Sequence, residues 1–279
     1  MKKSLIATAL LLTPVVVPAQ TLDTVVVTAS RIAQTADDSL ASVTVITRDD
    51  IERQQAYSVP DLLRGVPGLN VVSTGGRGNN TSLFLRGTNS NHVLVLIDGI
   101  KVGSATTGQA AFEDLPIDEI ERIEIVRGPR SSLYGSEALG GVIQIFTHRG
   151  GGELRPYFSL GGGSYRTIEG SAGLRGGGDH GWFNVGISGV DTQGFDTCRA
   201  EAATAFGGCF TDEPDRDGHS NLSGSLRAGY RFSPILEMDV FGLLSRSDTE
   251  FDGDFQNESE TASRFWAAPY GGHRSPPGI

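Results

Sequence analysis

Residues 221–232, NLSGSLRAGYRF, alternate between apolar and polar side chains over most of their length. Side chains of a β-strand point to opposite faces in turn, so this alternation predicts a strand with one apolar and one polar face. The segment Leu236–Ser245 alternates in the same way, and only three residues separate the two. The apolar face of the first strand carries Leu222, Leu226, Ala228, Tyr230 and Phe232, and its polar face carries Ser223, Ser225, Arg227 and Arg231.

Three further strand candidates precede this pair, at Tyr157–Gly161, Thr167–Leu174 and Trp182–Val190. Alternating segments of about ten residues separated by turns are typical of an outer-membrane β-barrel, although a soluble β-sandwich alternates in the same way. The long polar insertion Asp191–Ser220 favours the barrel, which carries long loops at one end and short turns at the other. We therefore assign residues 150–261 to the first antiparallel strands of a transmembrane β-barrel with extracellular loops.

The last residues depart from this pattern. Residues 262–279 contain Pro269, Pro276 and Pro277 and do not alternate, so we interpret them as an aberrant tail. About 130 residues follow residue 149, which leaves room for roughly five or six strands.

Residues 39–149 lack the long alternating segments of the later part and instead combine short helix and strand patterns. Acidic residues after Arg48 predict the first turn of a short helix, and Pro60 and Gly65 bracket a second helix at Val59–Arg64. Short strands mixed with short helices predict a compact α+β domain. The strand candidates are Ser42–Thr47, Leu69–Ser73, Leu83–Arg86, Val93–Ile97, Ile120–Val126 and Val142–Thr147.

The amino terminus predicts export. Residues 1–19 combine Lys2 and Lys3 with an apolar run and a final Ala19, the three parts of a secretory signal peptide; a membrane anchor is the alternative. A net charge of −10 disfavours binding to nucleic acid. Because the sequence contains neither zinc-site spacing nor a nucleophile motif, we expect a protein that is not an enzyme.

Residues 20–38 contain a β-branched stretch, Asp23–Ser30, which reads DTVVVTAS and has no neighbouring partner strand. We expect this stretch to be extended and mobile, able to add a strand to the sheet edge of another protein. The alternative is that it forms the first strand of the domain that follows.

Acidic residues gather in two of the predicted loops. Glu213, Asp215 and Asp217 have the spacing of the first half of an EF-hand loop, but Gly224 stands where that motif needs its last glutamate. Clustered carboxylates can still share one Ca²⁺, and two solvated acidic loops are the alternative. Export also permits a disulfide between Cys198 and Cys209, with two free thiols as the alternative. The other acidic residues are Asp196 and Asp212 in the first loop, and Asp248, Glu250, Asp252 and Asp254 in the second.

Several motifs in order resemble the TonB-dependent outer-membrane receptors. Val59–Gly68 is similar to the helix and turn of their plug domain, and Leu85–Gly87, Val95–Gly99 and Val126–Gly135 are similar to later plug motifs. Ser136–Thr147 resembles the strand that leads into their barrel of roughly 22 strands. Against that number, the resemblance implies an incomplete barrel from a truncated or frame-shifted chain, unable to insert and transport alone because unpaired strand edges are costly in lipid. The resemblance also implies a TonB box, the strand that couples the receptor to its energy source, at Asp23, Thr24, Val25, Val26, Val27, Thr28 and Ala29.

Within the family, Arg86–Gly99 and Arg127–Gly135 are most similar to the cobalamin receptors. That similarity implies cobalamin contacts, although Asn80 and Thr107 replace apolar residues. It also implies outer loops that calcium orders, although Glu213 stands where the cobalamin receptors are expected to have an amide side chain. The cysteine pair is not part of this similarity. The implied cobalamin contacts are Asn80, Ser82, Asn89 and Thr107, and the implied calcium ligands are Asp196, Glu213, Asp215, Asp217 and Asp252.

The resemblance implies a receptor in the lipid of the outer membrane of a Gram-negative bacterium. Its ligand binds the outer face of the plug, and TonB, driven by its inner-membrane complex, pulls on the TonB box so that the plug rearranges. No covalent step is involved. Two alternatives stay open: the same family with a ferric siderophore or another nutrient as cargo, or a secreted β-rich adhesin with an α+β head.

Overall fold

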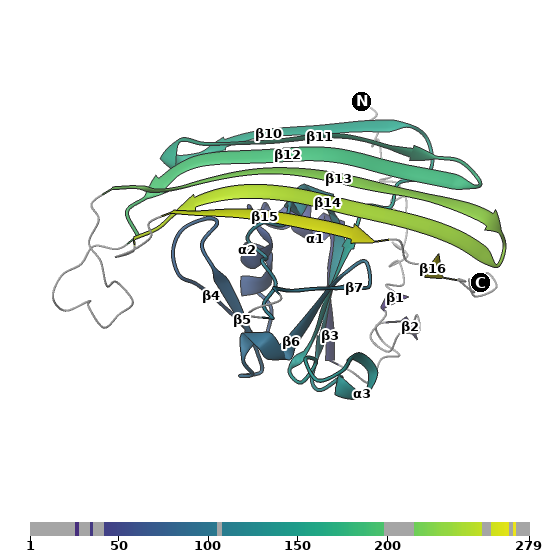
Figure 1. Cartoon of the computed structure of the whole chain (residues 1–279), viewed down its shortest axis with the longest axis horizontal. Helices are drawn as coiled ribbons and strands as arrows, with labels where there is room; N and C mark the ends of the chain where they lie inside the picture. The colour runs from purple at the N-terminus through teal and green to yellow at the C-terminus, as the bar shows by residue number, and fades with distance from the viewer. Residues whose placement is uncertain are drawn as a thin grey trace, which may run out of the picture.

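The computed structural model describes residues 42–104, 108–197, 215–252 and 258–267, together with short strands at 26–27, 34–35 and 270–271. Two units fill these ranges: an N-terminal α+β domain, and a large antiparallel sheet that lies across one side of it (Figure 1). The order of the two units confirms the predicted α+β domain followed by an incomplete antiparallel barrel.

The N-terminal domain is built on a five-stranded sheet with the strand order β3-β8-β9-β6-β7. The β6–β9 pair is parallel and the other pairs are antiparallel, while β4 and β5 form a separate hairpin. Its elements are β3 (Ser42–Thr47), α1 (Arg48–Gln54), α2 (Val59–Arg64), β4 (Leu69–Ser73), β5 (Thr81–Leu85), η1 (Ser90–His92), β6 (Val93–Ile97), β7 (Ile100–Val102), η2 (Ile117–Glu119), β8 (Ile120–Arg127), α3 (Ser131–Tyr134) and β9 (Gly141–Thr147).

Local capping explains why both predicted helices form. Thr47 and Asp50 make a reciprocal capping box at the start of α1, which satisfies backbone N–H groups that have no partner within the helix. Ser58 caps α2 through the backbone N–H of Asp61, and Pro60 lies in the first turn, where a missing N–H is harmless. Short helices of this kind depend on such caps and on burial of their apolar faces.

The core of the domain lies between its sheet, its helices and the large sheet. Ile123 and Ile125 of β8 pack with Ile143 and Ile145 of β9, and all four side chains are almost fully buried. Leu62 and Leu63 of α2 join this cluster, and so do two residues of the large sheet, Phe241 and Leu243. The two units therefore share one apolar core.

The large sheet is an up-and-down meander in the order β10-β11-β12-β13-β14-β15. In β13 the side chains of Leu222, Leu226 and Phe232 are exposed, whereas Ser223 and Ser225 face the N-terminal domain and are buried. This confirms the two faces predicted for residues 221–232. The strands are β10 (Arg155–Gly163), β11 (Thr167–Gly177), β12 (Gly181–Phe195), β13 (Asp217–Ser233), β14 (Leu236–Glu250), β15 (Glu258–Ala267) and β16 (Tyr270–Gly271, paired with β14), with η3 at Ser164–Arg166.

Several features differ from the sequence prediction. β12 runs to Phe195 and β13 begins at Asp217, so the insertion between them is shorter than residues 191–220. β15 continues to Ala267 and β16 follows, so strand structure extends past residue 262, where the aberrant tail was expected. Val26–Val27 (β1) pairs with Gln34–Thr35 (β2), so the stretch expected to lack a partner strand has one nearby.

The alternative of a β-sandwich fails because the inner face of the large sheet is covered by the α+β domain, not by a second large sheet, within the described ranges. None of the helices in the described part of the chain has the length and apolar character needed to cross a membrane.

Candidate functional site

Three of the predicted calcium ligands meet at one end of the large sheet. One carboxylate oxygen from each of Asp215, Asp217 and Asp252 lies within 4.8 Å of the other two. Asp217 opens β13 and Asp252 follows β14, so the antiparallel pairing of these strands brings them together. Asp217 is buried, and its Oδ2 accepts hydrogen bonds from the backbone N–H (2.7 Å) and the hydroxyl (2.6 Å) of Thr197.

The chemistry of this acidic cluster (Asp215, Asp217 and Asp252) fits a hard divalent cation. Three carboxylates so close together repel one another when ionised, and a cation that accepts six to eight oxygen ligands relieves the repulsion. Both carboxylate oxygens of Asp252 are buried, whereas Asp215 is exposed, so the cluster opens to solvent on one side. Asp196 lies beside Thr197 but is not one of the three grouped residues, and Glu213, Cys198 and Cys209 lie outside the described residues.

The predicted ligand contacts lie on and next to the β4–β5 hairpin. In β5 the side chains of Thr81, Leu83 and Leu85 are buried, so Ser82 points to the opposite, half-buried face. Asn80 directly precedes β5 and is exposed. Asn89 is also exposed, and the neighbouring Ser90 accepts the backbone N–H of Leu83 at 3.1 Å, which ties this turn to β5. Thr107 lies outside the described residues.

A cavity of about 440 Å³ lies beside the loop between β4 and β5 and is lined both by this loop and by the large sheet. Tyr57, Arg77, Tyr165 and Phe195 line it, and Arg77 spans it with an ion pair of 2.8 Å to Glu169 of β11. The loop is therefore attached to the sheet by a partly buried charge pair beside a space that admits solvent.

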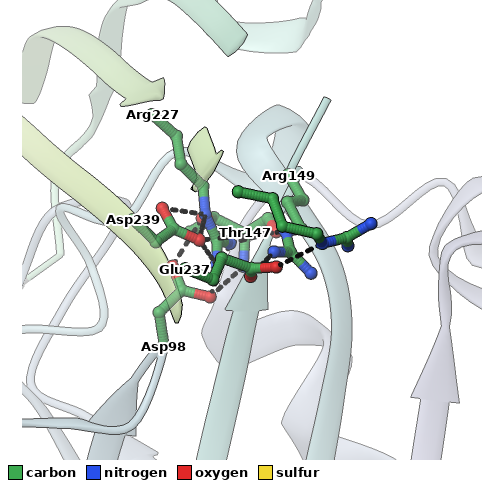
Figure 2. A network of polar contacts seen from close by, with 7 residues as sticks. Asp98, Thr147, Arg149, Arg227, Glu237 and Asp239 are labelled. Atoms are coloured by element: carbon green, nitrogen blue, oxygen red, sulfur yellow. Dashed lines mark hydrogen bonds and ion pairs between the residues drawn. The ribbon is translucent and has the colours of Figure 1, made fainter. Parts of the chain in front are cut away.

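A second set of charged contacts joins the domain to β13 and β14 (Figure 2). Arg227 of β13 bridges two carboxylates, Asp98 of the domain at 3.0 Å and Asp239 of β14 at 2.9 Å. Arg227 also donates to the backbone carbonyl of Thr147 at 3.1 Å. Next to this group, Arg149 pairs with Glu237 of β14 and stacks on Trp182 at 4.0 Å.

The backbone presents Asp98 for this role. Asp98 and Gly99 form the two-residue turn between β6 and β7, and both have positive φ, +49° and +83°. Asp-Gly is the pair that such a hairpin turn favours, because a left-handed backbone strains most other residues. Burial raises the pKa of the Asp98 carboxyl, and the Arg227 guanidinium and the Thr147 hydrogen bonds oppose that rise.

The comparisons with known proteins agree with this architecture. Residues 35–142 match the model of the TonB-dependent receptor plug domain. The chain therefore contains the plug domain that this family of receptors shares. The vitamin B12 transporter BtuB of Photobacterium profundum is 35% identical over 263 residues, 91% of this chain and 41% of the relative. The BtuB of Vibrio cholerae is 44% identical over 272 residues, 95% of this chain and 42% of the relative.

Solved receptors have the same fold. The ferripyoverdine receptor of the outer membrane of Pseudomonas aeruginosa has a TM-score of 0.65 at 19% identity, over 81% of this chain and 28% of that one. The siderophore receptor PirA of Acinetobacter baumannii has a TM-score of 0.60 at 23% identity, over 76% and 32%. These relatives are transporters and receptors, not enzymes. The chain spans about two fifths of the length of the curated relatives quoted above.

In family terms, the N-terminal domain is the plug and the large sheet is barrel wall. Sequence reasoning missed the polar residues that join them. Glu119 of the plug is buried and accepts hydrogen bonds from Tyr157 of β10 and Asn184 of β12, both at 3.0 Å. Gly186 leaves room for this carboxylate, since a Cβ there would overlap it. A signal was available for one of them, because Asn184 is a polar residue between Phe183 and Val185.

Proposed function

We propose that this chain forms the plug and the opening barrel strands of a receptor that imports cobalamin across the outer membrane. The similarity to vitamin B12 transporters over more than nine tenths of the chain is the observation that carries this proposal. The solved siderophore receptors support the fold alone, because their identity is 19% and 23%. The location in the outer membrane of a Gram-negative bacterium and the signal peptide at residues 1–19 belong to the same proposal.

In the proposed mechanism, the plug binds cobalamin through Asn80, Ser82, Asn89 and Thr107. Amide and hydroxyl groups of this kind suit the polar periphery of a large corrin ligand. TonB then pairs with the stretch from Asp23 to Ala29 and pulls it, and the plug rearranges to release the ligand inward. The short β1–β2 pairing supports this role, because two residue pairs are a weak contact that a partner's sheet edge can replace.

Calcium belongs to the proposal as a structural ion. Asp215, Asp217 and Asp252 would hold it, with Asp196 and Glu213 as further ligands, and the ion would fix the outer end of the sheet. A disulfide between Cys198 and Cys209 would restrain the same loop.

We test calcium and cargo together in a chimera in which this chain replaces the matching part of the Vibrio cholerae transporter. Cyanocobalamin is titrated with calcium or with a chelator present. We expect chelation to weaken binding at least about tenfold, which corresponds to about 1.4 kcal/mol. The Asp252→Asn variant should bind weakly with or without calcium. Equal affinity in calcium and chelator would contradict the calcium site, and an absence of cobalamin binding under all conditions would contradict the cargo.

A further inference from the structure

The plug loop between β4 and β5 is in unusually close contact with the barrel wall. Gly78 has a φ of +81°, and a methyl group at this position would lie 2.5 Å from Cε1 and 2.6 Å from Cγ of His219. Atoms that are not bonded do not approach so closely. The His219 imidazole therefore occupies the space that a side chain at position 78 would need.

His219 cannot easily move away from the loop. It lies on β13, is only 3% exposed, and its Nδ1 lies 2.9 Å from the hydroxyl of Thr249 on β14. His219 and Thr249 are also paired in the strand register. The imidazole is thus fixed by burial and by its neighbouring strand.

Two further contacts hold the same loop. The position of Gly76 is flanked by Thr197 and Phe195, which a Cβ there would meet at 3.8 and 3.9 Å. Arg77, between the two glycines, pairs with Glu169 and donates to the carbonyl of Tyr57 at 2.9 Å. Three successive loop residues therefore lie close to β12, β11 and β13.

These contacts lead from the acidic cluster to Asn80. Asp217 and His219 are two residues apart in β13, so their side chains share the inner face, and Asp217 also holds Thr197 by two hydrogen bonds. At the other end, the backbone N–H of Thr74 donates to the carbonyl of Asn80 at 3.1 Å and closes the loop. Fixing the loop therefore fixes Asn80.

We propose that His219 is a positioning residue: it fits the slot left by Gly78, seats residues 74–80 on the barrel wall, and so sets the place of Asn80 relative to the acidic cluster. Only the role of Asn80 as a ligand contact rests on the proposed function. A loop that is already seated loses less conformational entropy when a ligand binds, so His219 would favour binding without touching the ligand.

The test is a double-variant cycle in the full chain, purified in detergent without cobalamin. Trypsin cleavage after Arg77 reports detachment of the loop, and hydrogen exchange of residues 74–80 gives a second readout. We expect Gly78→Ala, which introduces the overlap, and His219→Ala, which empties the slot, each to speed cleavage about tenfold. In the double variant the new methyl group fits the emptied slot and only the backbone strain at a φ of +81° remains. Cleavage should therefore be at least about fivefold slower than the product of the two single effects predicts.

Gly87→Ala is the matched control. Gly87 has a similar φ of +77°, but a Cβ there meets nothing within 4 Å, so this variant reports backbone strain alone. His219→Ala should not rescue it. Slow exchange in β8 and β9 shows that each variant stays folded, and if Gly78→Ala does not fold, His219→Ala alone still tests the contact. Additive effects of Gly78→Ala and His219→Ala, or unchanged cleavage in His219→Ala, would overturn the proposal. Since no cobalamin is present, either failure leaves the proposed cargo untouched.

Discussion

Arg227 binds the two units to each other through charges that are almost completely removed from water. Its side chain is 13% exposed, and that of its plug partner Asp98 is 3% exposed. A buried ion pair adds little net stability compared with two apolar side chains in the same place. Removing only one partner is costly, because the other is left as an unpaired charge in a low dielectric. The same logic applies to Glu119, whose two hydrogen-bond donors both come from the barrel wall.

Replacement of Arg227 by Met should therefore destabilise the chain strongly, because Asp98 and Asp239 would lose their shared cation. We expect a loss of about 3–5 kcal/mol in the free energy of unfolding, measured by urea titration. Arg246→Met is the control, because the Arg246–Glu260 pair is exposed (66% and 59%); its loss should cost under about 1 kcal/mol. Equal effects of the two substitutions would refute the assigned role.

Glu113 gives a prediction that depends on pH. Burial raises the pKa of its carboxyl to about 7, from 4.5 in an unfolded chain, and its Oε2 is buried with no hydrogen-bond partner in the described ranges. Between these pH values the folded state holds the proton more tightly, so stability falls as pH rises through the window. Glu113→Gln cannot ionise and should escape this loss.

The measurement compares unfolding of the parent and of Glu113→Gln at pH 5 and pH 8. The free energy of unfolding of the glutamine variant, relative to that of the parent, should be greater at pH 8 than at pH 5. The difference between the two proteins isolates Glu113 from the other buried carboxyls, such as Asp114, whose pKa burial also raises. A difference that does not change with pH would show that Glu113 ionises normally in the fold.

At the scale of elements, alternate side chains of β5 face opposite ways, so the core residues and the proposed ligand contact Ser82 lie on different faces of the same strand. Leu83 is 1% exposed in the plug core, while its neighbour Ser82 faces the other way. Leu83→Ala should cost about 2–5 kcal/mol of stability. Ser82→Ala should change stability by less than about 0.5 kcal/mol but weaken cobalamin binding in the chimera. Thermal unfolding and cobalamin titration of both variants make the comparison, and weaker binding by Leu83→Ala alone would remove Ser82 from the ligand contacts.

The existence of most helices and strands could be predicted from the local sequence pattern, but the residues at which they begin and end could not. Residues 217–220 are polar, yet they continue β13 because backbone hydrogen bonds to β12 and β14 extend the ladder beyond the apolar alternation. The short helix α3 has no side-chain cap at its start, so the local sequence contains no signal that predicts this helix. Side-chain periodicity predicts that a strand exists, whereas the length of the strand depends on the neighbouring strands.

The acidic loops could be singled out from residue spacing, but only the resemblance selected the individual ligands within them. Asp217 and Asp252 are distant in sequence, and strand pairing alone brings them to one place. The pairing of Arg227 with Asp98 joins residues 129 apart, and no spacing rule could have matched them. Contacts between the plug and the barrel wall arise from tertiary packing, so they had to come from the structure.

At the scale of the whole molecule, the large sheet has two chemically different faces. Its outer face exposes Leu160, Leu222 and Phe232, as strands that face lipid do, and its inner face presents serines, threonines and charged groups to the plug. Polar contacts such as those of Arg227 and Glu119 hold the plug, and Phe241 and Leu243 of the large sheet also enter its apolar core. A polar interface is suited to rearrangement, because water can replace each hydrogen bond that is broken.

The most direct test of the proposed function is cobalamin uptake by cells. Vibrio cholerae cells that lack their own vitamin B12 transporter would express the chimera, and uptake of labelled cyanocobalamin would be followed over time. We predict that the chimera restores uptake and that Val26→Pro, which blocks strand pairing in the TonB box, abolishes uptake while cobalamin still binds to the cells. A chimera that reaches the outer membrane but carries a ferric siderophore and no cobalamin would contradict the account.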